Sequence, residues 1–312
     1  MVLFYICEHS YVELKTFLSM LISQSAGKFL KRKSSIEVGN EVIDFTLPVV
    51  MGVVNVTPDS FYDGGKLEDE KTLLATVEKM IGDGAAVIDV GAVSTRPGAA
   101  LVSTKDELGR LLPALQAIRN SFPKIPISVD TYRSWVAVRV LDEIGPIIVN
   151  DISGGTLDSK MFETIGKLDV PYVLSHIQGT PQNMQENPVY QNLIREMSAY
   201  FSEKVKRLTK LGVKEIIIDP GFGFGKKLEH NYEILNRLDS FKVFQLPVMV
   251  GLSRKSMIWK ALDITAEMAL NGTTVANTMA LLGGADILRV HDVKEAVEAT
   301  KIFTEIKAIT IQ

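Results

Sequence analysis

Residues 49–55, Val-Val-Met-Gly-Val-Val-Asn, form a short apolar run that finishes on a polar side chain. Seven further runs of this kind follow along the chain. They are rich in valine and isoleucine and show almost no polar alternation, which is typical of parallel strands buried on both faces. The polar residues that finish the eight runs are Asn55, Asp89, Asp130, Asn150, His176, Asp219, Ser253 and Arg289.

Helix-length segments separate the runs. In the first segment the apolar residues recur at spacings of three and four, as on one face of an α-helix. Residues 232–241 predict a later helix of the same kind. Because strand and helix alternate eight times after residue 46, the sequence predicts a (β/α)8 barrel, a TIM barrel with eight parallel strands. The active site of such a barrel lies where the C-terminal ends of the strands meet.

Length and charge fit one domain of this kind. The 312 residues, less an N-terminal segment, leave roughly the 250 residues typical of one barrel. Lys and Arg number 34 against 37 Asp and Glu, a net charge of −3, which gives no field to attract nucleic acid. The single cysteine, Cys7, excludes an internal disulfide framework and favours a reducing compartment, so we expect a cytoplasmic protein.

Residues 1–35 lie outside the eightfold pattern, and we predict one domain over residues 36–312. The apolar start is interrupted by charged residues from Glu8 onward, so no run approaches the roughly 20 residues of a membrane helix. It also lacks the features of a signal peptide. This extension is either a loosely packed amphipathic helix or the result of a translation start placed too early, and we assign it no function. Ser35–Asp44 predicts a short hairpin that would close the barrel's lower mouth.

The loops after the first two runs carry candidate binding groups. The side-chain oxygen of Asn55 suits a hard cation such as Mg²⁺, held jointly with substrate phosphates. Alternatively, Asn55 only closes a loop of turn-forming residues. The second loop, residues 91–99, is longer than the usual connection and suggests a lid. Within it, Arg96 offers a planar donor fork for a phosphate or carboxylate, unless it is a solvated surface arginine.

Three acceptor side chains finish the third, fourth and sixth runs: Asp130, Asn150 and Asp219. In a barrel these positions converge on one pocket. Carboxylates and an amide suggest recognition of a flat heterocycle that bears N–H donors. A metal–carboxylate cluster is the competing interpretation, with His176 as its further strand-end ligand. A neutral, structural role explains His176 more readily.

Glycine-rich and cationic segments follow the last three runs. Residues 220–226, Pro-Gly-Phe-Gly-Phe-Gly-Lys, combine a backbone that can approach a ligand closely with aromatic faces for stacking. The loops after the seventh and eighth strands are where barrels often bind phosphate. Arg289 and His291, two residues apart on a strand, point the same way, and a pyrophosphate would satisfy both. The alternatives are an ion pair for Arg289 and a place beside a helix N-terminus for His291.

Taken together and in order, seven segments resemble the dihydropteroate synthases, and the resemblance extends from Val49 to about Phe303. It implies a transferase that condenses 6-hydroxymethyl-7,8-dihydropterin diphosphate with p-aminobenzoate, giving 7,8-dihydropteroate and diphosphate in folate biosynthesis. It also implies Mg²⁺ as cofactor, a homodimer, and sulfonamides as mimics of p-aminobenzoate. The segments are Asn-Val-Thr-Pro-Asp-Ser-Phe at 55–61, Ser-Thr-Arg-Pro-Gly at 94–98, Ser-Val-Asp-Thr at 128–131, Asn-Asp-Ile-Ser-Gly-Gly at 150–155, Asp-Pro-Gly-Phe-Gly-Phe-Gly-Lys at 219–226, Ser-Arg-Lys-Ser at 253–256 and Arg-Val-His-Asp at 289–292.

The resemblance also implies roles for single residues. The pterin would be bound by Asp130, Asn150, Asp219 and Lys255. The diphosphate would be bound by Asn55, Thr95, Arg289, Val290 and His291, with Asn55 also a ligand of Mg²⁺. The p-aminobenzoate would be bound by Thr95, Pro97, Phe224 and Ser256. The residues with catalytic roles would be Lys255, Arg96 and Asp219. This chemistry needs charge stabilisation rather than a nucleophilic side chain.

Two positions depart from the family's usual pattern. Val93 stands where the family commonly has Glu, and Ser175 stands where it commonly has Met. The first change removes a charge from the lid, and the second reduces apolar packing around the pterin. Both bear on substrate affinity more than on the type of reaction.

Two other functions fit a pterin-binding barrel. One is a methyltransferase that moves a methyl group from methyltetrahydrofolate to a corrinoid protein. That reaction releases no diphosphate, so it gives no reason for cationic side chains to gather around Asn55. The other is a pterin-binding protein without turnover. Release of diphosphate coupled to use of p-aminobenzoate distinguishes the synthase from both.

Overall fold

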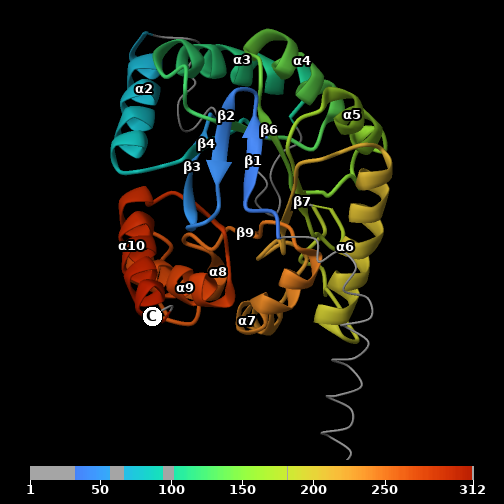
Figure 1. Ribbon diagram of the computed structural model, residues 1–312, viewed down its shortest axis with the longest axis vertical. Helices are drawn as coiled ribbons and strands as arrows, with labels where there is room; N and C mark the ends of the chain where they lie inside the picture. The colour runs from blue at the N-terminus through green and yellow to red at the C-terminus, as the bar shows by residue number, and fades with distance from the viewer. Residues whose placement is uncertain (1–31, 57–66, 94–101, 181, 311–312) are drawn as a thin grey trace, which may run out of the picture. The chain divides into compact units, whose positions relative to one another are not determined.

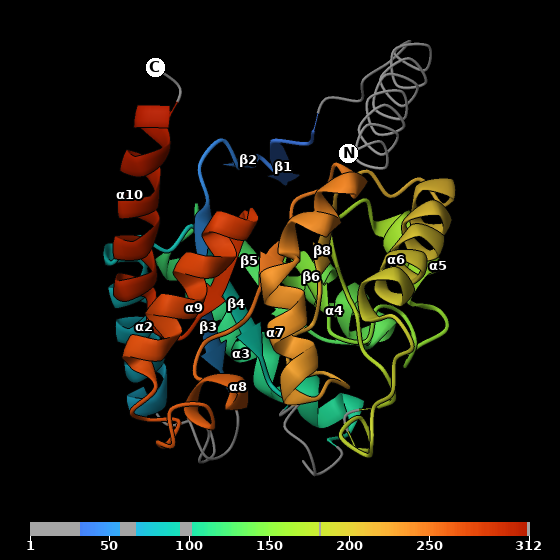
Figure 2. The same cartoon turned by 90° about the horizontal axis from the view of Figure 1, so that it is seen from below.

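The computed structural model of the protein describes residues 32–56, 67–93, 102–180 and 182–310. Within these ranges, strands alternate with helices as predicted, and the helices surround the strands (Figures 1 and 2). The barrel strands are β3 (Val49–Asn55), β4 (Val87–Gly91), β5 (Ile127–Asp130), β6 (Ile148–Asp151), β7 (Tyr172–Ser175), β8 (Ile216–Asp219), β9 (Met249–Val250) and β10 (Ile287–Val290). The helices are α2 (Leu67–Gly82), α3 (Thr104–Ser121), α4 (Ser134–Ile144), α5 (Met161–Leu168), α6 (Leu193–Lys210), α7 (Leu228–Asn236), α8 (Ser256–Trp259), α9 (Leu270–Gly283) and α10 (Val293–Thr310), with a 3₁₀ helix η1 (Leu238–Phe244).

The strands form one parallel sheet of eight in the order β8-β7-β6-β5-β4-β3-β10-β9. The pairing of β10 with β3 joins the last strand to the first. The two edges meet through a parallel bridge between Ile218 of β8 and Val248, next to β9. This arrangement confirms the predicted (β/α)8 barrel.

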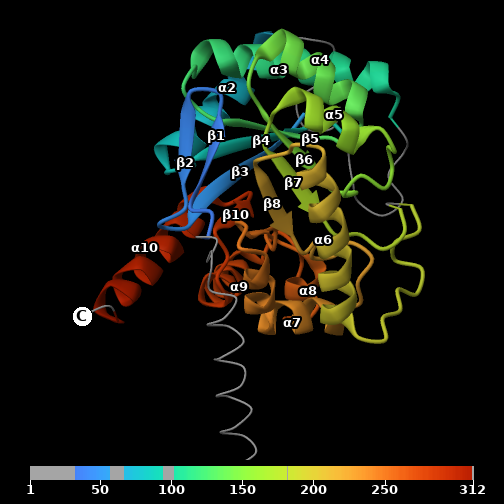
Figure 3. The same ribbon diagram turned by 45° about the vertical axis from the view of Figure 1, so that its right-hand side comes forward.

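A hairpin precedes the barrel, as predicted (Figure 3). Its strands, β1 (Ser35–Val38) and β2 (Glu41–Asp44), pair antiparallel. Gly39 turns the chain at a φ of +62°, where a Cβ atom would lie 2.6 Å from Pro146 Cγ. The apolar side chains of the hairpin pack against interior residues at the lower ends of the strands, so the hairpin closes the lower mouth. The cluster comprises Ile36, Val38, Ile43, Phe45, Met51, Val87, Ile148, Val173, Ile217, Met249 and Ile287.

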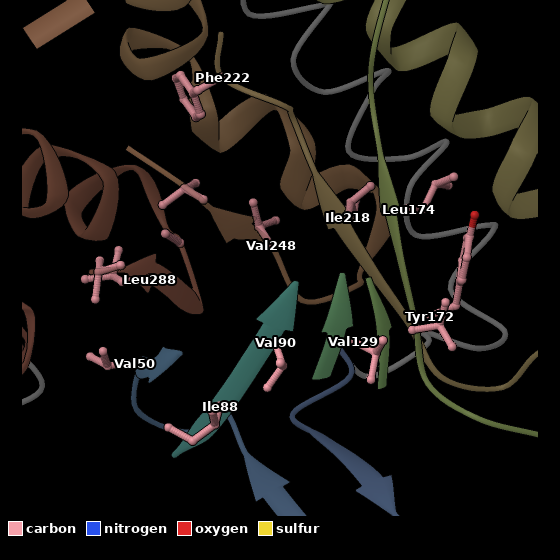
Figure 4. Close-up of a cluster of buried hydrophobic side chains, with 14 of the residues drawn as sticks. Val50, Ile88, Val90, Val129, Tyr172, Leu174, Ile218, Phe222, Val248 and Leu288 are labelled. Carbon is pink, nitrogen blue, oxygen red and sulfur yellow. The ribbon is translucent and has the colours of Figure 1, made fainter. Parts of the chain in front are cut away.

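The strand residues divide between two apolar layers. Figure 4 shows side chains of the outer layer, which face the helices, among them Val50, Ile88 and Leu288. Their neighbours along the strands face the interior and pack on the hairpin. Because strand side chains alternate between faces, the residue two positions after each lower interior residue also faces the interior, nearer the upper mouth. Five of these upper positions carry polar side chains, Asp89, Asn150, Ser175, Asp219 and Arg289, and the other two are Val53 and Gly251.

One predicted helix differs from the structure. In place of a single helix over residues 232–241, α7 begins at Leu228 and η1 follows after Arg237. The backbone N–H of Lys227 donates to His230 Nδ1 at 3.1 Å, which caps a polar first turn. Apolar spacing does not reveal such a start. Among the residues that the structure describes, no helix is long and apolar enough to span a membrane.

Candidate active site

The upper mouth of the barrel brings together polar side chains from strands far apart in the sequence. Asp89 lies on β4, Asp130 on β5, Asn150 on β6, Asp219 on β8 and Arg289 on β10. The polar residues therefore stand within the strands, where the sheet's hydrogen bonds hold their backbones. This placement agrees with the convergence that the sequence predicts.

Arg289 lies between two carboxylates. Its Nε donates to Asp89 Oδ2 at 2.7 Å, and its Nη2 donates to Asp130 Oδ2 at 2.8 Å. Nη2 is also 2.6 Å from Asp89 Oδ2, and the Asp89 side chain is fully buried. The ion pair considered as the alternative for Arg289 is thus present in this structure.

Burial and the neighbouring charges shift the pKa values of Asp130 and Arg289 in this cluster. Burial raises the pKa of Asp130 to about 7, since Arg289 only partly offsets the lost hydration and Asp89 adds negative charge. Burial opposes the charge on Arg289, but the carboxylates of Asp89 and Asp130 outweigh it and raise the Arg289 pKa above its usual value. Arg289 is therefore a permanent cation at the site.

Asn150 presents an acceptor to the interior. Its Nδ2 donates to both oxygens of Asp89, at 3.3 and 3.2 Å. Its Oδ1 is buried and has no hydrogen-bond partner among the described residues, and the same holds for Ser128 Oγ. A buried polar atom without a partner is costly, so it marks a place where a ligand's donor fits.

Asp219 is held at both oxygens and is 7% exposed. Oδ1 accepts from the backbone N–H of Gly221 at 2.8 Å, and Oδ2 accepts from Ser175 Oγ at 3.3 Å. Where the family commonly has a methionine, this chain thus supplies a hydroxyl that bonds to Asp219.

Lys255 reaches over the same end of the barrel from the loop after β9. Its Nζ donates to the carbonyl oxygen of Phe222 and lies 4.8 Å from the ring centroid of Phe224. Burial lowers the pKa of Lys255 to about 8, with Asp219 opposing the shift. Lys255 is therefore a cation whose charge can be lost near neutral pH.

Lys226 organises the glycine-rich loop and was missed by the sequence reasoning. Its Nζ donates to the carbonyl oxygens of His176, Gly221 and Phe224, at 3.1, 2.9 and 2.9 Å. It also lies 3.0 Å from His176 Nδ1. Burial lowers the pKa of both Lys226 and His176 well below their usual values. This arrangement agrees with the structural interpretation of His176.

The remaining predicted residues lie around this centre or outside the described part of the chain. His291 Nδ1 is 3.2 Å from Ser253 Oγ, and Ser256 is exposed at the start of α8. The Val290 side chain is fully buried in the outer apolar layer, so only its main chain can face a ligand. Three predicted residues lie outside the described ranges: Thr95, Arg96 and Pro97.

Asn55 is exposed at the upper end of β3, where its amide oxygen can reach a ligand. Among the described residues, no group of three or more His, Cys, Asp or Glu side chains could hold a metal ion. Mg²⁺ commonly takes one or two protein oxygens together with substrate phosphates and water. The exposed amide oxygen of Asn55 is compatible with that mode of binding.

Asp89 is the main site residue that sequence reasoning left without a role. It finishes the second apolar run and was counted among the eight polar strand ends. That position was a usable signal, but its partners, Arg289 and Asn150, are 200 and 61 residues away in the sequence. Only the fold brings them together.

Comparisons with known proteins identify the family of this chain. A family model described as "Pterin binding enzyme" matches residues 51–291, which is more than half of the chain. The dihydropteroate synthase of Escherichia coli (strain K12) is 43% identical over 262 residues, covering 83% of this chain and 92% of that protein. The chain belongs to the dihydropteroate synthase family. The dihydropteroate synthase of Haemophilus influenzae is 39% identical over 266 residues, covering 85% of this chain and 96% of that protein.

Solved structures of dihydropteroate synthases have the same fold. The Yersinia pestis dihydropteroate synthase with a sulfonamide drug complex has a TM-score of 0.82 and 38% identity, covering 88% of this chain and 99% of that one. The Xanthomonas albilineans dihydropteroate synthase with 4-aminobenzoic acid has a TM-score of 0.80 and 32% identity, covering 88% and 98%. As a member of the dihydropteroate synthase family, this chain is a transferase of folate biosynthesis, which confirms the predicted function.

Proposed function

We propose that this chain condenses 6-hydroxymethyl-7,8-dihydropterin diphosphate with p-aminobenzoate at the upper mouth of the barrel, within a catalytic domain of residues 36–312. The observation that carries the proposal is the buried acceptor Asn150 Oδ1, which lacks a partner among the described residues and lies beside the carboxylate cluster. The amino-pyrimidinone edge of a pterin offers N–H donors that match such an acceptor. Asp130, Asn150, Asp219 and Lys255 bind the pterin.

The diphosphate occupies the side of the site formed by β3 and β10. Arg289 supplies the permanent cation there, and the main chain of Val290 and then His291 follow it at the end of β10. Asn55 lies on β3, which pairs with β10. Thr95 and Arg96, from the second loop, complete the set.

Mg²⁺ is the proposed metal, held by the side-chain oxygen of Asn55 together with oxygens of the substrate. When bound, it neutralises charge on the departing diphosphate. The exposed position of Asn55 at the end of β3 supports this role.

Chemistry at this site is a substitution at the methylene carbon of the pterin. The bond between that carbon and the diphosphate oxygen breaks, and its electron pair leaves with the diphosphate. The carbon's positive charge spreads into the ring, where Asp130 and Asp219 stabilise it. The amine of p-aminobenzoate then forms the new C–N bond and releases a proton. Arg289 stabilises the leaving group, and Lys255 orients the pterin, with no covalent enzyme intermediate.

The p-aminobenzoate lies near the glycine-rich loop. Phe224 offers a partly buried aromatic face beside Lys255, and Ser256 offers an exposed hydroxyl at the start of α8. Thr95 and Pro97, which lie outside the described residues, are proposed to contact it as well. We propose that sulfonamides compete for this place.

A homodimer is proposed through α9 and α10, which pack on one another. Val275, Met279 and Leu282 lie on one face of α9 and are 54%, 49% and 65% exposed. On α10, Ile302 and Ile306 are 65% and 56% exposed. An apolar surface of this kind favours association of two copies.

Substitution of Met279 by Glu should weaken the dimer, since a charge would be buried in the apolar interface. Sedimentation velocity is expected to show dimers for the unaltered chain and a shift towards monomers for Met279→Glu. Val243→Glu is a matched control on a different element, at a residue 70% exposed on η1. Equal dimer stability for Met279→Glu and the control would contradict the assigned surface.

Cytoplasmic location is proposed on the single cysteine, Cys7, because one thiol in 312 residues fits a reducing compartment. Cell fractionation with an antibody against the chain tests it. Recovery in a membrane or secreted fraction would contradict it. Residues 1–35 are assigned no function.

The assay measures diphosphate release from 6-hydroxymethyl-7,8-dihydropterin diphosphate with Mg²⁺, with and without p-aminobenzoate, and dihydropteroate by chromatography. We expect both products in equal amounts and only when p-aminobenzoate is present. Pterin binding without either product would identify a binding protein without turnover. Absence of pterin binding would refute the assignment of the pterin edge.

A further inference from the structure

Asp89 lies beneath the proposed site and contacts both of its halves. Its carboxylate accepts from Arg289 of β10, on the diphosphate side, and from Asn150 of β6, on the pterin side. Its side chain is fully buried. Burying a carboxylate is costly unless it is paired and hydrogen-bonded. The hydrogen bonds to Arg289 and Asn150 stabilise Asp89 in this position, and they in turn restrict both partners.

The contact with Asn150 determines which atom that amide offers to a ligand. A side-chain amide has one donor end and one acceptor end. Asp89 is a carboxylate that can only accept, so it holds the Nδ2 end of Asn150, at 3.2 and 3.3 Å. The Oδ1 end consequently points elsewhere, and it is the buried acceptor without a partner among the described residues.

Asp89 also restrains Arg289, the cation on the diphosphate side of the site. Asp89 Oδ2 accepts from Nε at 2.7 Å and lies 2.6 Å from Nη2. Nη2 also donates to Asp130 at 2.8 Å. The guanidinium of Arg289 is thus paired with two carboxylates, which weaken its attraction for an anion such as diphosphate.

We propose that Asp89 is a positioning residue of the reaction, whose carboxylate fixes Asn150 as an acceptor for the pterin and draws Arg289 away from the diphosphate. The proposal rests on the proposed function of the surrounding residues. It predicts effects of opposite sign on two ligands when the carboxylate is replaced by an amide. An amide at position 89 can donate as well as accept, so it no longer selects one orientation of Asn150. The substitution also removes the negative charge that Asp89 places beside Arg289.

The test compares Asp89→Asn with the unaltered chain and with Asp83→Asn, a control at a surface aspartate that pairs with Lys79. Calorimetry measures binding of 6-hydroxymethyl-7,8-dihydropterin and, separately, of pyrophosphate with Mg²⁺. For Asp89→Asn we expect pterin affinity to fall about 10- to 100-fold, the range for losing an interaction of a charged group. Pyrophosphate affinity should rise, and an unchanged value would refute the arm of the inference that involves Arg289. Asp83→Asn should change neither affinity.

Unchanged pterin affinity in Asp89→Asn would overturn the inference. Parallel losses for pterin and pyrophosphate would also overturn it, because a purely structural role weakens both. If the unaltered chain binds pterin but not pyrophosphate, the arm of the inference that involves Arg289 fails. If it binds neither ligand, the proposed function fails, and the inference fails with it.

A double-mutant cycle separates positioning from general damage. Asn150→Ala removes the acceptor that Asp89 is proposed to orient. In that background, Asp89→Asn should cost much less pterin affinity than it does in the unaltered chain. Full additivity of the two substitutions would show that Asp89 does not act on the pterin through Asn150.

Discussion

At the scale of single residues, the site holds two groups with pKa values displaced towards neutrality in opposite directions. Burial raises the pKa of Asp130 to about 7 and lowers that of Lys255 to about 8. In the proposed site Asp130 binds the pterin as a carboxylate, and Lys255 binds it as a cation. Both charged forms coexist only over a narrow range of pH.

The dependence of kcat/KM for the pterin substrate on pH should therefore be bell-shaped. Below about pH 7, Asp130 gains a proton and loses an acceptor; above about pH 8, Lys255 loses its charge. In Lys255→Arg the alkaline limb should move to higher pH, because a guanidinium keeps its proton. Rates measured from pH 5.5 to 9.5 test this, and a profile without limbs would contradict it.

Arg289 yields a second prediction at this scale. Arg289→Ala should weaken binding of the diphosphate form of the pterin more than binding of the free 6-hydroxymethyl form, by about 10-fold or more for a charge-assisted contact. Calorimetry with the two ligands measures the difference. Equal losses for both would show that Arg289 serves only the carboxylates of Asp89 and Asp130.

Much of the candidate site was predictable at the level of residues, because barrel strands deliver their polar ends to one place. Asp130, Asn150 and Asp219 were found in this way. The bond from Ser175 to Asp219 was not, and neither was the role of Asp89. Both depend on which side chains meet across the barrel interior, and strand periodicity does not specify those pairs.

At the scale of elements, the loop between β8 and α7 is bound to the loop after β7. Gly221 has a φ of +68°, and a Cβ there would lie 2.1 Å from the carbonyl oxygen of His176. That carbonyl also accepts from Lys226. The backbone of the loop therefore has no room for a side chain at this glycine.

Gly221→Ala should cost about 1–3 kcal/mol of unfolding free energy from backbone strain and should raise KM for p-aminobenzoate. The loop carries Phe224, so its displacement also disturbs the neighbour of Lys255. Urea unfolding and steady-state rates measure the two effects. Gly82→Ala, in α2 with no atom within 4 Å of the added Cβ, is the matched control and should be nearly neutral. Similar behaviour of both variants would contradict the prediction.

The ends of a helix were predictable where apolar spacing defines them. They were not predictable where a capping hydrogen bond defines them. The limits of α4, at Ser134 and Ile144, follow from its amphipathic pattern. The start of α7 depends instead on a histidine side chain that accepts from a backbone N–H. A single polar contact of that kind leaves no periodic signal.

At the scale of the whole molecule, the hairpin β1–β2 completes the interior that the barrel strands leave open below. Ile36 is fully buried among the lower ends of the strands. Ile36→Ala should lower the unfolding free energy by about 2–5 kcal/mol, the usual cost of removing a large core side chain. Val42→Ala, on the same hairpin at 62% exposure, should change it little.

Denaturant unfolding of the two variants tests this contribution. The catalytic rate constants of Ile36→Ala, measured without denaturant, should stay close to those of the unaltered chain, because the hairpin lies at the mouth opposite the site. Equal stability of Ile36→Ala and Val42→Ala would show that the hairpin is not part of the core.

The eightfold architecture was predictable as a whole, since every repeat carries the same pattern. The outcome for residues 1–31 was not testable, because they lie outside the described residues. The contacts among the polar side chains of the upper interior were also beyond the sequence, because only the closed barrel brings Asp89, Asn150 and Arg289 together.

The join between β8 and β9 has a consequence for motion. The strand β9 has two residues, and the join has one bridge, Ile218 to Val248, with a 2.9 Å bond from the Ile218 N–H to Pro247 O. Asp219 follows on one side of this join, and Lys255 lies on the loop from the other. Transient opening here separates two walls of the pterin pocket while leaving the rest of the sheet paired. A bound pterin would contact both sides of this join and hold them together. Amide hydrogen exchange at Ile218 should therefore slow when the pterin binds.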